Sequence, residues 1–329
     1  MNKKYIVVDL ANTFFRARHS VNRQSDISER CGFAIHTTLA SIQKVCRDQN
    51  ADHTVLCLEG RSWRKDYYKP YKANRSEARA AMSVRDAEED RAFWDTYDQL
   101  TEFFKNKTNC TVLQHSRLEA DDLIAGWVQT RPDDQHVIVS TDSDYIQLLS
   151  TNVSIYNGVN KELITVGGVF NDRGRAVVDK KTTVAKVAPE PEWALFEKCM
   201  RGDSSDNVFS AFPGVRVKSS KKSVGLEEAF RDRHARGYAW NNLMLQRWVD
   251  HDGVEHRVLD DYQRNRTLVD LSAQPQEIRD IIVETIESAQ AKSVPMIGTE
   301  FLRFCGRHEL VKLSEQSSYY VDILTRTLL

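Results

Sequence analysis

The sequence predicts an α/β protein with a mostly parallel central sheet, and two observations lead to this prediction. Through residues 1–188, short apolar runs that are typical of buried strands alternate with longer helical patterns. Such alternation is typical of a parallel sheet that is covered by helices on both faces. From Pro189 onward the strand patterns fade and helical patterns continue. We therefore expect an α/β domain over residues 1–188 and a helical domain over residues 189–329.

The expected elements follow one another in a regular order. Apolar and β-branched residues predict strands at 5–9, 53–58, 110–114, 136–141 and 153–156. Apolar residues that recur every three to four positions predict helices at 33–49, 84–106, 117–130 and 143–149. Segments 161–166 and 175–179, separated by glycine-containing turns, are expected to form a hairpin.

The composition is that of an ordinary globular protein, with 41% hydrophobic and 28% charged residues. No apolar run approaches the ~20 residues of a membrane span, and the N-terminal residues lack the long apolar region of a signal peptide. The six cysteines are far apart, without the paired spacing of a zinc site or a disulfide framework. We expect a cytoplasmic monomer with reduced cysteines.

The net charge of −1 argues against a nucleic-acid partner, but the charges are unevenly distributed. Between Arg61 and Arg79 there are seven basic residues and two acidic ones. Smaller basic runs occur at 173–186 and 216–222. A protein with such segregated charge can be neutral overall and still bind a polyanion.

Three of the predicted strands have a carboxylate at their carboxyl end: Asp9 is the last residue of the first, and Glu59 and Asp142 directly follow the other two. Ligands of an open parallel sheet bind beyond the carboxyl ends of its strands. If these strands are neighbours, the three side chains meet at one edge. Hard divalent cations are the natural counter-charge for such a pocket.

Three further acidic motifs have both a structural and a functional interpretation. In 116–122, Ser116 and Glu119 fit a helix capping box, but the adjacent Asp121 and Asp122 are better explained by a shared cation. In 141–144 an aspartate could simply cap a helix, and in 203–206 the acids could lie in a solvated turn. The coincidence of all these motifs favours a metal site.

The segment 67–75 interleaves tyrosines with lysines and an arginine. This pattern suits a phosphodiester backbone with unstacked bases. The structural alternative is an exposed helix entrance with ordinary surface charges. Because the segment follows the strand that ends at Glu59, we expect its cations to lie beside the acidic edge.

Taken in order, five motifs resemble the flap endonuclease and 5′→3′ exonuclease superfamily, in particular its bacteriophage 5′ nucleases of the RNase H type. They are Val7-Val8-Asp9, Tyr71 to Arg75, Glu119 to Asp122, Ser140 to Asp144, and Gly202 to Val208 leading to Pro213-Gly214-Val215.

This resemblance implies a PIN-like domain with a helical arch around 61–107, two Mg²⁺ ions for which Mn²⁺ can substitute, and a helix–three-turn–helix motif around 193–235. It places at the first metal Asp9, Glu59, Glu119 and Asp121. It places at the second metal Asp122, Asp142, Asp144, Asp203 and Asp206. Lys72 would contact the scissile phosphate with Arg75 beside it, so that the implied catalytic residues are Lys72, Arg75, Asp9, Asp121 and Asp142. The basic segment 61–79 would contribute to nucleic-acid binding Arg64, Lys69, Lys72, Arg75 and Arg79.

The chain departs from the family pattern at two places. The family usually has aspartate where this chain has Glu59. The loop that begins Pro213-Gly214-Val215 lacks a second glycine, which argues against binding of a monovalent cation there. We expect this loop instead to contact phosphates through four cations: Arg216, Lys218, Lys221 and Lys222.

The resemblance implies a Mg²⁺-dependent structure-specific 5′ nuclease that removes RNA primers or DNA at 5′ ends or flaps. Its partners would be DNA and RNA–DNA duplexes, with a single-strand-binding protein or a sliding clamp as further candidates. Two alternatives are a non-catalytic protein of the same fold that binds branched DNA, and a metal-dependent phosphatase acting on small phosphate esters.

Overall fold

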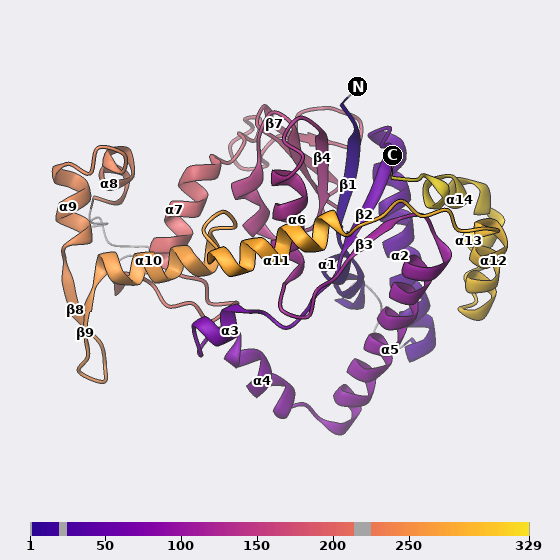
Figure 1. The fold of residues 1–329 in the computed structure, drawn as a ribbon, viewed down its shortest axis with the longest axis horizontal. Coiled ribbons are helices and arrows are strands. Elements are labelled where there is room, and N and C mark those ends of the chain that lie inside the picture. The colour runs from indigo at the N-terminus through magenta and orange to yellow at the C-terminus, as the bar shows by residue number, and fades with distance from the viewer. Residues whose placement is uncertain (1, 20–24, 214–224, 329) are drawn as a thin grey trace. The chain divides into compact units, whose positions relative to one another are not determined.

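The computed structural model describes residues 2–19, 25–213 and 225–328. The chain forms two compact units (Figure 1). Unit 1 comprises Met1–Ser62, Met82–Ala188 and Glu277–Leu329, and unit 2 comprises Trp63–Ala81 and Pro189–Gln276. This division differs from the expected continuous split at 188, because each unit also takes a segment from the other half of the chain.

Unit 1 is built on a seven-stranded sheet in the order β3-β2-β1-β4-β5-β6-β7. Its strands are β1 (Lys4–Asp9), β2 (His53–Cys57), β3 (Thr111–Leu113), β4 (Gln135–Val139), β5 (Val153–Asn157), β6 (Glu162–Thr165) and β7 (Gly168–Asn171). The first five strands are parallel, and β6 and β7 extend the sheet as an antiparallel hairpin. The predicted mixed α/β fold with a mostly parallel sheet is therefore confirmed.

The strand order reverses at β1, and this reversal determines where a ligand site is expected in the sheet. From β1 the chain first adds β2 and β3 on one side and then β4 and β5 on the other. Asp9 pairs in register with Cys57 of β2, and Val8 pairs with Val139 of β4. Such a reversal opens a crevice at the carboxyl ends of the strands, where doubly wound proteins bind their ligands.

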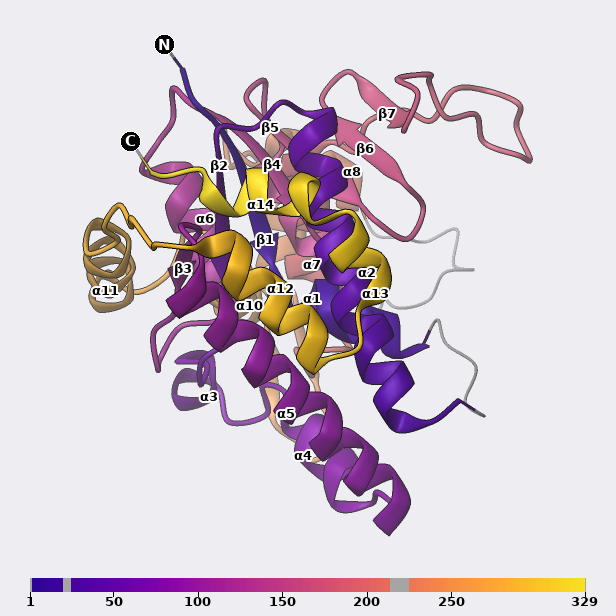
Figure 2. The same ribbon diagram turned by 90° about the vertical axis from the view of Figure 1, so that its right-hand side faces the viewer.

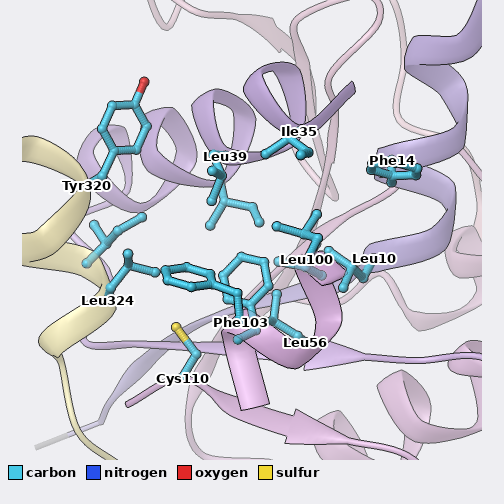
Figure 3. Packing of buried hydrophobic residues seen from close by; sticks show 14 of the residues in the cluster. Leu10, Phe14, Ile35, Leu39, Leu56, Leu100, Phe103, Cys110, Tyr320 and Leu324 are labelled. Carbon is cyan, nitrogen blue, oxygen red and sulfur yellow. The ribbon is translucent and has the colours of Figure 1, made fainter. Parts of the chain in front are cut away.

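Helices cover both faces of this sheet. Those of unit 1 are α1 (Leu10–Phe15), the 3₁₀ helix η1 (Arg16–His19), α2 (Ile27–Asp48), α5 (Val84–Lys107), α6 (Ala120–Gln129), the 3₁₀ helix η2 (Ser143–Leu148), α11 (Gln276–Glu287), α12 (Ile297–Arg307), α13 (Val311–Glu315) and α14 (Ser317–Thr325). Figure 2 shows α12 to α14 lying along α2 and α5. In the core between them, Phe103 and Leu324 pack with Leu39 and Leu56 (Figure 3). On the other face, Trp127 of α6 packs edge-on against Tyr5 of β1.

Unit 2 is mostly helical. It contains α3 (Arg64–Tyr67), α4 (Ala73–Ala80), α7 (Pro191–Arg201), α8 (Leu226–Asp232), α9 (Tyr238–Met244) and α10 (Val258–Val269), with a hairpin of β8 (Arg247–Val249) and β9 (Glu255–Arg257). One apolar cluster gathers side chains of α7 to α10. A second cluster packs Tyr71 against Cys199, Val208 and Leu268, which ties segment 63–81 to the helices.

Three local expectations were wrong. The hairpin after β5 pairs 162–165 with 168–171, whereas 175–179 contributes only isolated bridges. The helix expected at 117–130 begins at Ala120. Two short strands, β8 and β9, occur where only helices were expected.

Helices α3, α4 and α5 occupy the segment 61–107 for which an arch was expected, the first two in unit 2 and the third in unit 1. In the part of the chain that the structure describes, no helix is long and apolar enough to cross a membrane.

Candidate active site

Asp9 is the centre of the site. It ends β1 at the position where the strand order reverses, and its side chain is only 5% exposed. Its carboxylate accepts hydrogen bonds from the Tyr145 hydroxyl at 3.0 Å, the Ser140 hydroxyl at 3.3 Å and the backbone N–H of Asn12 at 3.0 Å. The last bond also caps the N-terminus of α1.

Burial raises the pKa of Asp9 to about 6. The charge of Asp142 adds to this rise, and the three hydrogen bonds oppose it without outweighing burial. A buried carboxylate with a raised pKa lacks a sufficient counter-charge within the protein. A bound cation would supply that charge and favour the ionised form.

The Tyr145 phenol shows which other carboxylates share this environment. Its pKa is raised well above the ordinary value, first by burial and then by the charges of four carboxylates. These are, in order of decreasing effect, Asp9, Asp121, Asp142 and Glu59. We call these four residues the acidic cluster. They come from the ends of β1, β2 and β4 and from the first turn of α6.

Glu59 is placed by a close approach of two backbone segments. The N–H of Gly60 donates to the carbonyl of Leu118 at 2.8 Å. A Cβ on Gly60 would lie 2.1 Å from the carbonyl oxygen of His115, so only glycine fits. This contact brings the Glu59 carboxylate to the N–H of Ala120, at 3.3 Å. The N-terminus of a helix attracts negative charge, and it favours Glu59 and Asp121 at this position.

Glu119 and Asp122 are buried, and both carboxylates accept hydrogen bonds from within the protein. Together they form the capping box of α6, in which the Asp122 carboxylate accepts the N–H of Glu119 at 3.1 Å. The Ser62 hydroxyl donates to Glu119 at 2.6 Å. The capping box expected between Ser116 and Glu119 is therefore shifted by three residues. These contacts give both carboxylates a structural role in orienting the first turn of α6.

Asp142 and Asp144 open the 3₁₀ helix η2. The exposed Asp142 carboxylate accepts the N–H of Asp144 at 3.0 Å and so caps this helix. Asp144 is half-buried. The helical turn also brings Tyr145 onto Asp9. Sequence reasoning gave no role to Ser140, which begins the motif Ser140 to Asp144, or to Tyr145, which directly follows it.

The donor set of the acidic cluster fits a hard divalent cation, because it consists of carboxylate oxygens around a desolvated Asp9. Among the described residues, no three carboxylate, histidine or cysteine side chains already converge closely enough to hold a metal ion. Binding would therefore require these side chains to move, and the exposed Glu59 and Asp142 are the ones with room to do so.

In unit 2, Asp206 organises the basic segment. It accepts the Tyr71 hydroxyl at 2.9 Å and pairs with Arg75 at 2.7 Å and with Lys72 at 3.5 Å. Lys72 has a left-handed backbone, with φ of 53°, and donates its N–H to the carbonyl of Asp206 at 2.8 Å. Lys72 and Arg75, predicted as neighbours at a phosphate, are thus brought together here.

Asp203 is paired as well. Burial acts to raise its pKa, but the hydrogen bond and charge of Lys198, at 2.7 Å, together with bonds from Ser205, lower the pKa to about 2. Its backbone exchanges two hydrogen bonds with Val208 and closes a tight turn. Gly202 enters this turn with φ of 73°, where a Cβ would lie 2.3 Å from the carbonyl oxygen of Val208. Asp203 and Asp206, predicted as metal ligands, therefore engage lysine and arginine side chains within unit 2.

The predicted nucleic-acid contacts differ in exposure. Lys69, Arg75 and Arg79 are exposed. Arg64 is 1% exposed, and its Nε donates to the carbonyl of Leu268 at 2.7 Å. This packing removes Arg64 from the candidate contacts. The remaining four lie outside the described residues: Arg216, Lys218, Lys221 and Lys222.

The sequence matches a known family over the part that carries the acidic cluster. The profile of the 5′-3′ exonuclease N-terminal resolvase-like domain matches residues 4–180. That range contains the whole sheet of unit 1 and every residue of the acidic cluster.

Several curated proteins are similar to this chain, and two of them are described here. A 5′-3′ exonuclease of Mycoplasmopsis pulmonis is 27% identical over 191 residues, which are 57% of this chain and 55% of that protein. Ribonuclease H of Enterobacteria phage T4 is 27% identical over 195 residues, which are 54% of this chain and 56% of that protein. The chain spans little more than half the length of these relatives.

The fold is also similar to that of a bacteriophage T5 flap endonuclease, solved as a complex with DNA and metal ions. The TM-score is 0.58 at 19% identity, covering 87% of this chain and 98% of that one. At this identity the likeness concerns the fold.

Proposed function

This chain belongs to the family of 5′-3′ exonucleases that share the N-terminal resolvase-like domain, and from that premise we propose that it is a structure-specific 5′ nuclease. The proposed reaction is hydrolysis of phosphodiesters near the 5′ ends of DNA or RNA–DNA duplexes in replication, in the cytoplasm. The observation that carries the proposal is the acidic cluster: carboxylates from three strand ends and one helix, at the reversal of strand order, all raise the pKa of Tyr145, whose hydroxyl donates to Asp9.

The proposed cofactor is Mg²⁺ at two positions, with Mn²⁺ as a substitute. The residues that would hold it are those of the acidic cluster together with Asp144. When bound, such ions supply activation of a water molecule and stabilisation of the leaving oxygen. Glu119 and Asp122 have a positioning role. Their carboxylate oxygens accept hydrogen bonds that fix the first turn of α6 and thereby the position of Asp121. Asp203 and Asp206 are not needed for this proposal.

The acidic cluster has a second consequence for substrate. A phosphodiester is itself anionic, and the carboxylates alone would repel it. Cations must therefore offset the negative charge of the carboxylates and that of the substrate phosphate. We assign the role of binding substrate phosphate to Lys72 and Arg75, which Asp206 holds next to each other. A cation placed where negative charge develops lowers the barrier more than it strengthens binding.

The test is cleavage of 5′-labelled substrates. Flapped, nicked and RNA-primed duplexes are incubated with and without Mg²⁺, beside a chromogenic phosphate ester. We expect short labelled products from the duplexes in Mg²⁺, none in EDTA, and no turnover of the ester. The control is Asp142→Asn, which keeps a helix-capping oxygen but removes the charge. Hydrolysis of the ester alone would instead identify a phosphatase. DNA binding without cleavage would identify a non-catalytic relative.

A further inference from the structure

Unit 2 contains a cavity that the proposed nuclease site does not use. It has a volume of about 470 Å³ and is lined by residues of α7, α9 and α10, of the turn 233–236 that follows α8, and by Arg257 at the end of β9. This volume is within the range of roughly 300–1,000 Å³ that is typical of small-molecule sites. We call it the unit 2 cavity.

One wall of the unit 2 cavity is aromatic. Phe196, Trp240 and Tyr262 all line it. Trp240 and Phe196 are buried in the apolar cluster of unit 2, and each packs against Tyr262 with ring centroids 5.7 Å apart. Because these rings hold one another in place, the wall is already formed before a ligand arrives. A planar apolar group is the chemistry that such a wall accepts.

The charges that line the cavity do not cancel. Its two carboxylates are already paired, Glu192 with Arg233 and Asp270 with Arg266. Two further cations, Arg236 and Arg257, also line the cavity. Neither of these guanidinium groups has a partner among the described residues. The cavity therefore has surplus positive charge beside its aromatic wall.

The backbone of Arg236 is constrained in an unusual conformation. Its φ is +51°, in the left-handed region that non-glycine residues rarely adopt. Two bonds maintain it: the N–H of Arg236 donates to the carbonyl of Asp232 at 2.8 Å, and the Asn241 side chain donates to the carbonyl of Arg236 at 2.7 Å. Strained residues of this kind cluster at ligand sites, where the surrounding structure maintains them.

We propose that the unit 2 cavity binds one nucleotide, with its base against the aromatic wall and its phosphate between Arg236 and Arg257. A nucleotide combines the planar ring, the negative charge and the size that these three features require. It has two possible sources, a free mononucleotide or the terminal nucleotide of a single strand. The inference uses residues of unit 2 only and stands independently of the acidic cluster.

The test is isothermal titration calorimetry on the full chain in EDTA, so that neither cleavage nor binding through divalent ions contributes. The probes are deoxyadenosine 5′-monophosphate, deoxyadenosine and inorganic phosphate. We expect the mononucleotide to bind at least tenfold more tightly than either fragment, since only it engages both the wall and the arginines. Equal affinity for phosphate and for the mononucleotide, or no binding of the mononucleotide, would overturn the proposal.

Variants locate the site. Replacing both Arg236→Gln and Arg257→Gln should weaken mononucleotide binding at least tenfold, and Trp240→Phe should weaken it severalfold. The matched control is Arg247→Gln, an exposed arginine of the neighbouring hairpin that does not line the cavity. Circular dichroism and thermal melting verify that each variant is folded. Unchanged affinity in the folded double variant would refute the assignment.

Competition distinguishes the two sources. A 5′-phosphorylated tetranucleotide that displaces the mononucleotide assigns the cavity to the end of a strand. A tetranucleotide that does not displace it assigns the cavity to free nucleotides. Because the experiment contains no divalent ion, its outcome is independent of whether the chain cleaves DNA.

Discussion

Tyr145 donates its hydroxyl to the buried carboxylate of Asp9 across 3.0 Å, so the central residue of the acidic cluster has a neutral hydrogen-bond donor. This bond favours the ionised form of Asp9, yet burial still raises the pKa of that carboxyl to about 6. The phenol therefore compensates only part of the cost of desolvating the charge. The rest of this desolvation cost must be offset by a bound cation, or avoided by protonation of Asp9.

The metal-free protein should lose stability as the pH rises from about 4 to about 6. An unfolded aspartate releases its proton near pH 4, whereas folded Asp9 retains it up to a pKa of about 6. The folded state thus binds more protons in this window, and ionising Asp9 costs about 3 kcal/mol of unfolding free energy. Urea unfolding in EDTA at pH 4.5 and pH 7 measures most of this loss, about 2 kcal/mol.

The control for this prediction is Asp9→Asn, which keeps an acceptor for the N–H of Asn12 but cannot ionise. The difference in unfolding free energy between wild type and variant should change by about 2–3 kcal/mol across the window. Addition of Mg²⁺ at pH 7 should restore stability to the wild type and not to the variant. A pH-independent difference would contradict the role assigned to burial.

Both Asp142→Ala and Asp142→Asn should lower single-turnover cleavage at least 100-fold while DNA binding stays equal or tightens. Removing the charge weakens the proposed cation site and reduces repulsion of the phosphate backbone. Only Asp142→Ala should also lose about 1 kcal/mol of stability, because asparagine still caps η2. Quench-flow and fluorescence anisotropy measure the two effects, and normal turnover by either variant would refute the assignment.

Lys72→Ala should reduce the single-turnover rate by roughly 100-fold or more and weaken DNA binding only a few-fold. The proposed role of Lys72 is at the phosphate where charge develops, and loss of one such donor costs about 2.7–4 kcal/mol in other enzymes. The matched control is Lys69→Ala, an exposed lysine three residues earlier, for which both effects should be small. Equal rate losses in the two variants would reduce Lys72 to one phosphate contact among several.

Gly60→Ala should destabilise the protein by about 1–3 kcal/mol and lower cleavage, because its Cβ would collide with the carbonyl oxygens of His115 and Leu118. Relief of this collision moves Glu59 away from the start of α6. Thermal melting and the Mg²⁺ dependence of cleavage report the two consequences. The comparison is Gly167→Ala, where the nearest atom to an added Cβ lies 3.6 Å away and little change is expected.

The sequence was sufficient to predict the mostly parallel sheet of unit 1 and to single out acidic residues at the ends of its strands. Asp9 and Asp142 could be found because strands that alternate with helices form a parallel sheet, and the ends of its strands share an edge. Glu59 followed from the same argument. Tyr145 and Ser140 could not be given a role in this way. A single hydroxyl residue near an acidic motif forms no sequence pattern, so the sequence does not tell whether it bonds a site carboxylate or lies on the surface.

Other features depend on long-range packing. Arg64 lies among exposed cations in the sequence, and only its bond to Leu268 shows that it is buried. The assignment of 63–81 to unit 2 rests on Tyr71, which packs with residues more than a hundred positions away. The strands β8 and β9 have three residues each, too few to establish an alternating pattern.

The packing of α12 to α14 against α2 and α5 also determines when this protein can fold. Phe301 and Leu324 share one apolar core with Leu39 and Leu56, which leave the ribosome some 250 residues earlier. During synthesis, the apolar faces of α2 and α5 therefore lack their final cover until α14, which ends at Thr325, has been translated. The segment 189–276 must emerge in the meantime. Nascent chains of this protein are thus exposed to aggregation for longer than a chain whose first domain is complete in sequence.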